Sequence, residues 1–370
     1  MHPMSEYRAK LRTAAEAVSV IRSGDWVDYG MTLCQPMSLD EALAKRKEEL
    51  KDIKIRGTLA VAPRQVVETD PHRDTFTYCC WHFGGYERKL QERNLCNFIP
   101  MVYRNKPSFY RNHLEVDVAM IMTPPMDKHG YFNFSLTNSA TRAILETARI
   151  VIVEVNDKLP VALGGREECI HISEVDFVVE GDNRPILELP AAQPDEIDER
   201  AARLIVDEIV DGATIQLGIG GMPNAVGNMI AESDVRDLGM HTEMLVDAFL
   251  TMYEKGKLTN KHKQTDRGKG AWTFCLGSRR LYDWVDQNPF LASYPVDYTN
   301  DPAVIAQNDN FVSVNNCIEA DLYGQVSSET SGIRQISGSG GQLDFVTGAY
   351  ASRGGKSFMC FRSTYTDPRT

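Results

Sequence analysis

The chain has 370 residues, of which 42% are hydrophobic and 25% are charged, and its formal net charge is −11. This composition is typical of a globular protein with two to three domains, and it excludes a disordered or collagen-like chain. The acidic balance argues against a nucleic-acid partner, and the longest apolar stretches, such as 150–155, are too short to cross a membrane.

Short runs of apolar and β-branched residues alternate with helical patterns along the chain. Strands are predicted at 26–30, 53–55, 116–122, 149–155, 214–217, 311–314 and 357–361. Helices are predicted at 41–50, 139–148, 197–210, 225–232 and 281–288. Because parallel strands need crossover connections, this alternation predicts an α/β fold with mainly parallel sheets.

A proline-rich segment lies near the middle of the chain. Residues 181–194 contain three prolines, which remove backbone donors and fix φ, so the segment is predicted to be a linker. We therefore divide the chain into an N-terminal α/β domain at 1–185, a linker at 186–196 and a C-terminal α/β domain at 197–370.

The two halves open in a similar way. The first has a helical pattern at 15–23, then Gly24, a short strand and Gly30; the second has one at 199–211, then Gly212, a strand and Gly218. In both, a proline and another helix follow. The pattern predicts two tandem, structurally related open α/β domains with a cleft between them, and the alternative is a chance likeness of two α/β openings.

Two glycine clusters are candidate ligand sites. The segment 218–226 follows an apolar strand and opens a helix, whose N-terminus offers free N–H groups to a phosphate, carboxylate or oxyanion. Pro223 replaces the third glycine of the dinucleotide fingerprint, and no P-loop lysine follows. The second cluster lies at 337–345. The alternatives are a tight turn for the first cluster and a flexible loop for the second.

The runs 216–226 and 237–244 resemble the family I coenzyme A transferases, and in particular the butyryl-CoA:acetate and 4-hydroxybutyrate CoA-transferases of anaerobic bacteria, in the acetyl-CoA hydrolase/transferase family. The resemblance extends over nearly the whole chain. Further matching runs lie at 23–30, 125–134, 170–173, 294–301, 321–326 and 335–345.

The resemblance implies a covalent mechanism on Glu243. Its carboxylate would attack an acyl-CoA thioester, pass through a mixed anhydride to a glutamyl-CoA thioester, and hand CoA to a carboxylate such as acetate with ping-pong kinetics. This chemistry needs no metal and no cofactor, because coenzyme A is itself a substrate. The resemblance, together with the free N–H groups of the glycine clusters, assigns the CoA site to Gly220, Gly221, Met222, Pro223, Asn224 and Gly341, with Thr364 as a weaker candidate beyond the last strand.

Three other positions near this site have open roles. The loop 31–36 follows the first strand and is expected to face the acyl group and to influence acyl selectivity. Its Cys34 is interpreted as a buried side chain rather than a nucleophile. His241, two residues before Glu243, either orients or protonates a group in the site or is a simple loop histidine.

Relatives in this family extend beyond the point that matches the last residue of this sequence. We therefore expect the C-terminal domain to be incomplete, with strand edges and apolar faces uncovered. The alternatives to a transferase are an acyl-CoA hydrolase on the same fold and an inactive, truncated CoA-binding homologue, while Pro223 makes a NAD-dependent oxidoreductase a distant possibility. The acyl group remains open among butyrate, 4-hydroxybutyrate, propionate and crotonate.

The sequence also predicts where in the cell the protein is located and what it binds. Residues 1–6 show no signal-peptide pattern, and the eight cysteines form no CxxC pair, which is typical of a cytoplasmic protein with reduced thiols. The expected partners are a small acyl-CoA and a short-chain carboxylate, with no nucleic acid and no membrane, and we expect a homo-oligomer by analogy with the family.

Overall fold

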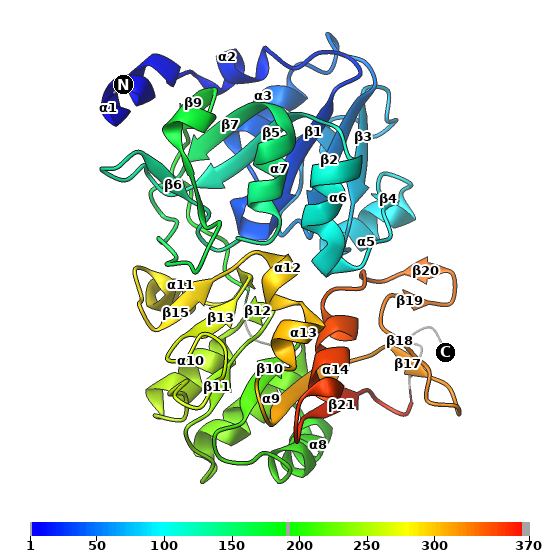
Figure 1. Cartoon of the computed structure of the whole chain (residues 1–370). Helices are drawn as coiled ribbons and strands as arrows, with labels where there is room; N and C mark the ends of the chain where they lie inside the picture. The colour runs from blue at the N-terminus through cyan, green and yellow to red at the C-terminus, as the bar shows by residue number, and fades with distance from the viewer. Residues whose placement is uncertain (1, 190–192, 365–370) are drawn as a thin grey trace.

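The computed structural model describes residues 2–189 and 193–364 and contains two α/β halves, the N-terminal one above and the C-terminal one below in Figure 1. The N-terminal half holds a seven-stranded sheet in which every neighbouring pair is parallel. In spatial order its strands are β4 (Asn97–Phe98), β3 (Phe76–Cys80), β2 (Ile53–Thr58), β1 (Trp26–Met31), β5 (Val116–Thr123), β7 (Ala148–Val155) and β9 (Phe177–Glu180).

Both faces of this sheet are buried, as expected for a parallel sheet. Successive side chains of a strand point to opposite faces, so on β5 Val118 and Met120 join one apolar cluster while Ala119 and Ile121 join another. The first cluster is covered by α2 (Ala14–Val18), α3 (Ser38–Ala44), α4 (Gln65–Glu68) and α5 (Gly85–Glu92). The second is covered by α6 (Lys106–His113) and α7 (Thr141–Thr147).

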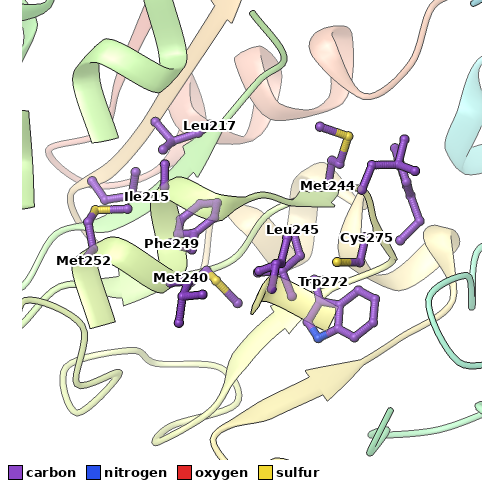
Figure 2. Close-up of a cluster of buried hydrophobic side chains, with 14 of the residues drawn as sticks. Ile215, Leu217, Met240, Met244, Leu245, Phe249, Met252, Trp272 and Cys275 are labelled. Carbon is purple, nitrogen blue, oxygen red and sulfur yellow. The ribbon is translucent and has the colours of Figure 1, made fainter. Parts of the chain in front are cut away.

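The C-terminal half is built on a four-stranded parallel sheet. Its order is β11 (Gly239–Met240), β10 (Thr214–Leu217), β16 (Phe311–Asn316) and β21 (Lys356–Cys360). The helices of this half are α8 (Glu196–Val206), α9 (Gly221–Glu232), α10 (Asp247–Glu254), α11 (Arg279–Val285), α12 (Val296–Thr299), α13 (Pro302–Ile305) and α14 (Gln342–Ala351). Figure 2 shows Ile215 and Leu217 of β10 packed with Phe249 and Met252 of α10.

Short strand pairs and turns complete the described chain. Helix α1 (Pro3–Lys10) precedes the first half, and 3₁₀ turns lie at Thr32–Cys34, Tyr103–Asn105 and Ile172–Glu174. The pairs are β6 (Tyr131–Asn133) with β8 (Cys169–His171), β12 (Met244–Leu245) with β14 (Phe274–Cys275), β13 (Gly270–Trp272) with β15 (Leu291–Ser293), β17 (Glu319–Ala320) with β18 (Val326–Ser327), and β19 (Thr330–Ser331) with β20 (Arg334–Gln335). Within residues 2–189 and 193–364, no helix is both long and apolar enough to span a membrane.

The structure confirms the mainly parallel α/β fold, and the seven predicted strands are present as β1, β2, β5, β7, β10, β16 and β21. Similar openings are found in the two halves: Gly24 precedes β1 and Gly212 precedes β10, each with a positive φ that favours glycine. The predicted linker carries no helix or strand in residues 181–189, and its residues 190–192 lie outside the described residues.

The predicted helices are present with different ends: 41–50 is α3, 139–148 is α7, 197–210 is α8, 225–232 is α9 and 281–288 is α11. Helix α3 ends at Ala44 because the following backbone bonds tighten to three-residue turns, as from Arg46 N to Leu43 O. Ala148 belongs to β7, because it pairs with Val116 of β5. Sequence patterns place such ends poorly, since tertiary partners decide them.

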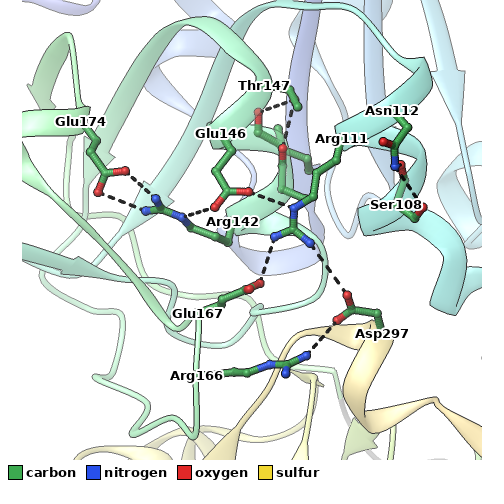
Figure 3. Close-up of polar contacts among 12 residues, drawn as sticks. Ser108, Arg111, Asn112, Arg142, Glu146, Thr147, Arg166, Glu167, Glu174 and Asp297 are labelled. Carbon is green, nitrogen blue, oxygen red and sulfur yellow. Dashed lines mark hydrogen bonds and ion pairs between the residues drawn. The ribbon is translucent and has the colours of Figure 1, made fainter.

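Apolar and polar contacts hold the two halves together. One apolar cluster contains Met31 and Met122 of the first half and Leu245 and Trp272 of the second. Figure 3 shows a polar contact between the halves, in which Asp297 of α12 lies 3.9 Å from Arg111 of α6 and 3.8 Å from Arg166. The halves therefore form a continuous packed structure around the site described next.

Candidate active site

Glu243 lies in the short segment between β11 and β12, at the boundary of the two halves. Its backbone oxygen accepts hydrogen bonds from the N–H groups of Thr273 (3.1 Å) and Phe274 (3.2 Å), which fixes the direction of the side chain. Asn300, at the end of α12, donates from Nδ2 to Glu243 Oε2 at 2.6 Å. The carboxyl group is thus held by one specific donor.

An apolar chamber that is partly open to solvent lies on one side of Glu243. Both halves contribute to its wall. The N-terminal half supplies Met31, Thr58, Leu59, Trp81, His82, Met101, Tyr103 and Lys106, and the C-terminal half supplies Ile219, Glu243, Phe274, Ser339 and Gly340. Hydrophobic and aromatic walls with a few polar groups are typical of small-molecule sites.

A second cavity, of about 700 Å³ including open space, also has Glu243 in its wall. Its lining is rich in glycine and more polar than that of the chamber, and most of it comes from the end of β10, the end of β16 and the loop before α14: Gly218, Ile219, Asn315, Asn316, Ser337, Gly338, Ser339, Gly340, Gly341 and Gln342. Glu243 therefore stands between an apolar chamber and a glycine-lined groove.

The glycine loop at 336–341 lies directly against Glu243. A Cβ atom at Gly341 would collide with Glu243 Oε2 and Asn300 Nδ2, so this close approach requires glycine. The loop is also attached to the N-terminal half. Phe83 N donates to Ser337 O at 3.2 Å, and Ser339 Oγ donates to Met101 O at 2.6 Å. These contacts hold the loop between the two halves.

The surroundings of Glu243 disfavour its charged form. Burial raises the pKa of the Glu243 carboxyl to about 8, the hydrogen bond from Asn300 opposes this rise, and the negative charge of Asp344 adds to it. Asp344 is itself buried and forms an ion pair with Arg104 of the N-terminal half. Burial raises the pKa of Asp344 to about 6, and Arg104 limits that rise.

His241 supports the site from behind rather than contacting Glu243. Its ring is buried among Tyr298, Phe311 and Phe345, and its Nε2 lies 2.8 Å from the backbone oxygen of Thr299. Burial lowers the pKa of His241 to about 4, so the imidazole is neutral at physiological pH. Thr299 precedes Asn300, so His241 orients the segment that carries the donor to Glu243.

The sequence-predicted CoA residues fall in separate places. Gly341 lies against Glu243, and Ile219, next to Gly220, lines both cavities. Gly221 and Met222 line another groove, between α8 and β21, and Pro223 is buried in α9. Among the described residues, those that line the two cavities beside Glu243 do not include Gly220–Asn224 or Thr364, which is exposed beyond β21. Their assignment to CoA stays a prediction.

The loop 31–36 reaches the site through one residue. Met31 lines the chamber, whereas the buried Cys34 has its Sγ 3.5 Å from Phe134 O, and burial raises the pKa of its thiol to about 11. Sequence reasoning gave no role to Asn300, Lys106 or Tyr103. Of these three residues, only Asn300 lies in a run that carries the family resemblance, at 294–301. That run is the only sequence signal that could have identified it.

Both halves of the chain are similar to known proteins of one family. Residues 1–190 match the acetyl-CoA hydrolase/transferase N-terminal domain, and residues 277–370 match the corresponding C-terminal domain. The chain is 52% identical to butyryl-CoA:acetate CoA-transferase of Anaerostipes caccae, over 98% of this chain and 82% of that protein. It is 50% identical to the probable butyrate:acetyl-CoA coenzyme A-transferase of Syntrophomonas wolfei, over 98% and 81%. The crystal structure of RipA from Yersinia pestis superimposes with a TM-score of 0.90 at 35% identity, over 99% and 84%.

Proposed function

Because the chain belongs to the acetyl-CoA hydrolase/transferase family, we propose that it transfers CoA from a short-chain acyl-CoA, with butyryl-CoA as the first candidate, to acetate through a glutamyl-CoA thioester on Glu243. One observation carries this proposal: Glu243 lines both the apolar chamber and the glycine-lined groove. The acyl chain would occupy the chamber, the pantetheine arm of CoA would follow the groove, and the thioester would lie at Glu243.

The proposed reaction has two half-reactions. The Glu243 carboxylate attacks the butyryl thioester carbonyl, which forms a mixed anhydride and releases CoA thiolate. The thiolate attacks the glutamyl carbonyl of the anhydride, so that butyrate leaves and glutamyl-CoA remains. Acetate attacks glutamyl-CoA to give a second anhydride and CoA thiolate, and the thiolate attacks the acetyl carbonyl to release acetyl-CoA and restore the carboxylate.

The residues around Glu243 have defined roles in this scheme. Asn300 Nδ2 holds one carboxyl oxygen, and as the carboxylate becomes an anhydride or a thioester it donates to the oxygen that remains on the glutamyl carbonyl. The apolar walls exclude water from the anhydride, and this favours acetate over water as the acceptor. The names of the relatives, which specify butyryl-CoA and acetate, support these two substrates.

Intact-protein mass spectrometry tests the covalent step. Wild-type protein incubated with butyryl-CoA is expected to gain the mass of CoA less one water, and acetate should remove this adduct while acetyl-CoA appears. Glu243→Gln, which keeps the size of the side chain but not the nucleophile, should give no adduct. Glu48→Gln, at an exposed glutamate of the N-terminal half, should behave as wild type.

Two outcomes would contradict the proposal. If folded wild-type protein forms no adduct, Glu243 is not the nucleophile. If butyryl-CoA is consumed at the same rate with and without acetate and no acetyl-CoA appears, water is the acceptor and the protein is a hydrolase. Replacement of butyryl-CoA by 4-hydroxybutyryl-CoA, propionyl-CoA or crotonyl-CoA in the same assay ranks the acyl groups.

A further inference from the structure

Lys106 is a buried cation in the wall of the apolar chamber. It is the first residue of α6 and only 1% exposed, and it lines the chamber together with Glu243. Its Nζ donates to Thr58 Oγ1 at 2.6 Å, which accounts for one of its three protons. Within residues 2–189 and 193–364, no carboxylate oxygen lies within 4 Å of this Nζ. Buried lysines are normally paired, but this ammonium, whose Nζ also lies 5.9 Å from the centre of the Tyr110 ring, has no carboxylate in direct contact among the described residues.

The charged groups around Lys106 act on its ammonium from a distance and not through a direct ion pair. Asp28 of β1 attracts the ammonium, but its two oxygens already accept from Gly30 N and Tyr110 Oη. Arg56 of β2 opposes the charge, and Cys80 of β3 is a buried thiol with a raised pKa. Burial lowers the pKa of Lys106 to about 8, with Asp28 limiting the fall, so the side chain is mainly protonated at neutral pH.

Across the chamber, the other titratable groups are uncharged in the covalent intermediate. Burial lowers the pKa of His82 to about 4, so its imidazole is neutral. Burial raises the pKa of Tyr103 well above its ordinary value, so its hydroxyl keeps its proton. As a thioester, Glu243 carries no charge. The Lys106 ammonium then provides the positive potential in a chamber that a carboxylate anion has to enter.

We propose that Lys106, held by Thr58, binds the carboxylate of the acyl acceptor in the second half-reaction. This inference rests on the proposed function. A carboxylate loses its hydration on entry into an apolar chamber, and a charge-assisted hydrogen bond from a fixed ammonium compensates for that loss. Lys106 forms no covalent bond: it orients the anion so that one oxygen reaches the glutamyl thioester carbonyl and CoA thiolate leaves.

Steady-state kinetics of Lys106→Met tests the proposal. The substitution keeps the length and the apolar part of the side chain, and the loss of a charge-assisted hydrogen bond should raise KM for acetate about 10- to 100-fold. KM for butyryl-CoA, which enters the chamber without a carboxylate, should stay within about threefold of wild type, whereas butyrate, which is released in the first half-reaction, should bind more weakly in the same way as acetate. Equal increases in the two KM values would overturn the proposal.

Two further variants separate the charge from general effects of burial. Thr58→Val keeps the ammonium and removes its anchor, so KM for acetate should rise selectively but less than in Lys106→Met. Lys263→Met removes another buried lysine, whose Nζ donates to Met240 O and Lys269 O outside the chamber. Lys263→Met should lower the free energy of unfolding without a selective increase in KM for acetate. A selective effect from Lys263→Met equal to that of Lys106→Met would overturn the assignment.

A binding measurement keeps this test independent of catalysis. In the Glu243→Gln background no adduct forms, and titration with acetate or butyrate followed by thermal shift reports carboxylate binding alone. Stabilisation by acetate should be present in Glu243→Gln and absent in Glu243→Gln/Lys106→Met. If wild type forms no CoA adduct but acetate still stabilises Glu243→Gln and not the double variant, the proposed function fails and the carboxylate site remains. If acetate stabilises both variants equally or neither, Lys106 does not bind the carboxylate.

Discussion

At the scale of single residues, Glu243 is held under opposing influences. Burial favours its neutral form, whereas the proposed nucleophilic attack requires the carboxylate. Asn300 is the described side chain that donates directly to it, and this hydrogen bond favours the charged form. The neutral His241 contacts the backbone oxygen of Thr299, the residue before Asn300. His241 and Asn300 therefore act on Glu243 by positioning it, and neither serves as an acid or a base.

The pH dependence of the first half-reaction follows from this balance. Because the proposed nucleophile is the deprotonated Glu243 and its pKa is raised to about 8, kcat/KM for butyryl-CoA should rise as the pH passes through 8. Asn300→Ala removes an influence that lowers this pKa, so the rise should move to higher pH and kcat/KM at pH 7 should fall about 10- to 100-fold. Adduct formation measured by stopped-flow across pH 6–10 checks both statements.

The control for Asn300→Ala is Gln307→Ala, an exposed amide that follows α13 and bonds to Ala303 O within its own segment. Its pH profile should coincide with that of wild type. A profile for Asn300→Ala that keeps the wild-type midpoint would mean that the hydrogen bond does not tune the ionisation of Glu243.

At the scale of elements, the site is built where parallel strands end. Met31 ends β1, Thr58 ends β2 and Trp81 follows β3, and all three line the chamber. In the other sheet, Gly218 follows β10 and Asn316 ends β16, and both line the glycine-lined groove. Both sheets therefore direct their carboxyl ends toward Glu243, which is the usual ligand side of open α/β sheets.

The glycine loop is the element most sensitive to a small change. Gly341→Ala would place a methyl group against Glu243 Oε2 and Asn300 Nδ2, so the loop or the carboxyl group must move. A misplaced nucleophile is expected to lower kcat/KM about 100-fold, with a modest loss of stability. Gly85→Ala, at the start of α5, where a Cβ would meet only the Arg88 guanidinium at an ordinary contact distance of 3.8 Å, should leave both properties unchanged. Adduct formation and urea denaturation measure the two effects, and an active Gly341→Ala would show that the contact is dispensable.

At the scale of the whole molecule, the two halves share the site as well as an apolar interface. The chamber wall comes from both, and the glycine loop of the second half is bonded to Phe83 and Met101 of the first. The ion pair of Arg104 with the buried Asp344 lies at the same boundary, at the start of α14. Separation of the halves would therefore disassemble the chamber and release the loop from Glu243.

The Arg104–Asp344 pair should contribute to the stability of the assembled halves. Arg104→Met leaves a buried carboxylate without its cation, and at pH 7 the free energy of unfolding should fall by about 1–3 kcal/mol. Arg353→Met breaks a pair with Asp309 in which the arginine side chain is 86% exposed, and a loss below about 1 kcal/mol is expected there. Urea denaturation compares the two. Equal losses in the free energy of unfolding would show that the Arg104–Asp344 pair stabilises the protein no more than the exposed Arg353–Asp309 pair does.

The sequence by itself determined the class of fold and the identity of the nucleophile candidate. Alternating strand and helix patterns predicted mainly parallel sheets, because local hydrophobic periodicity and crossover length are properties of short segments. The runs around Glu243 and the glycine clusters carried the family resemblance, which the comparisons confirm. Helix ends were less accurate, as for α3 and α8, because capping and tertiary contacts decide them.

Only the tertiary structure decided which distant residues gather around Glu243 and the chamber beside it. Met31, Thr58, Lys106 and Asn300 lie in separate segments, and their proximity depends on the order of strands in the two sheets and on how the halves pack. The same packing removes water from Glu243 and Lys106, which raises one pKa and lowers the other. Burial and long-range contact are properties of the assembled chain, so no local pattern encodes them.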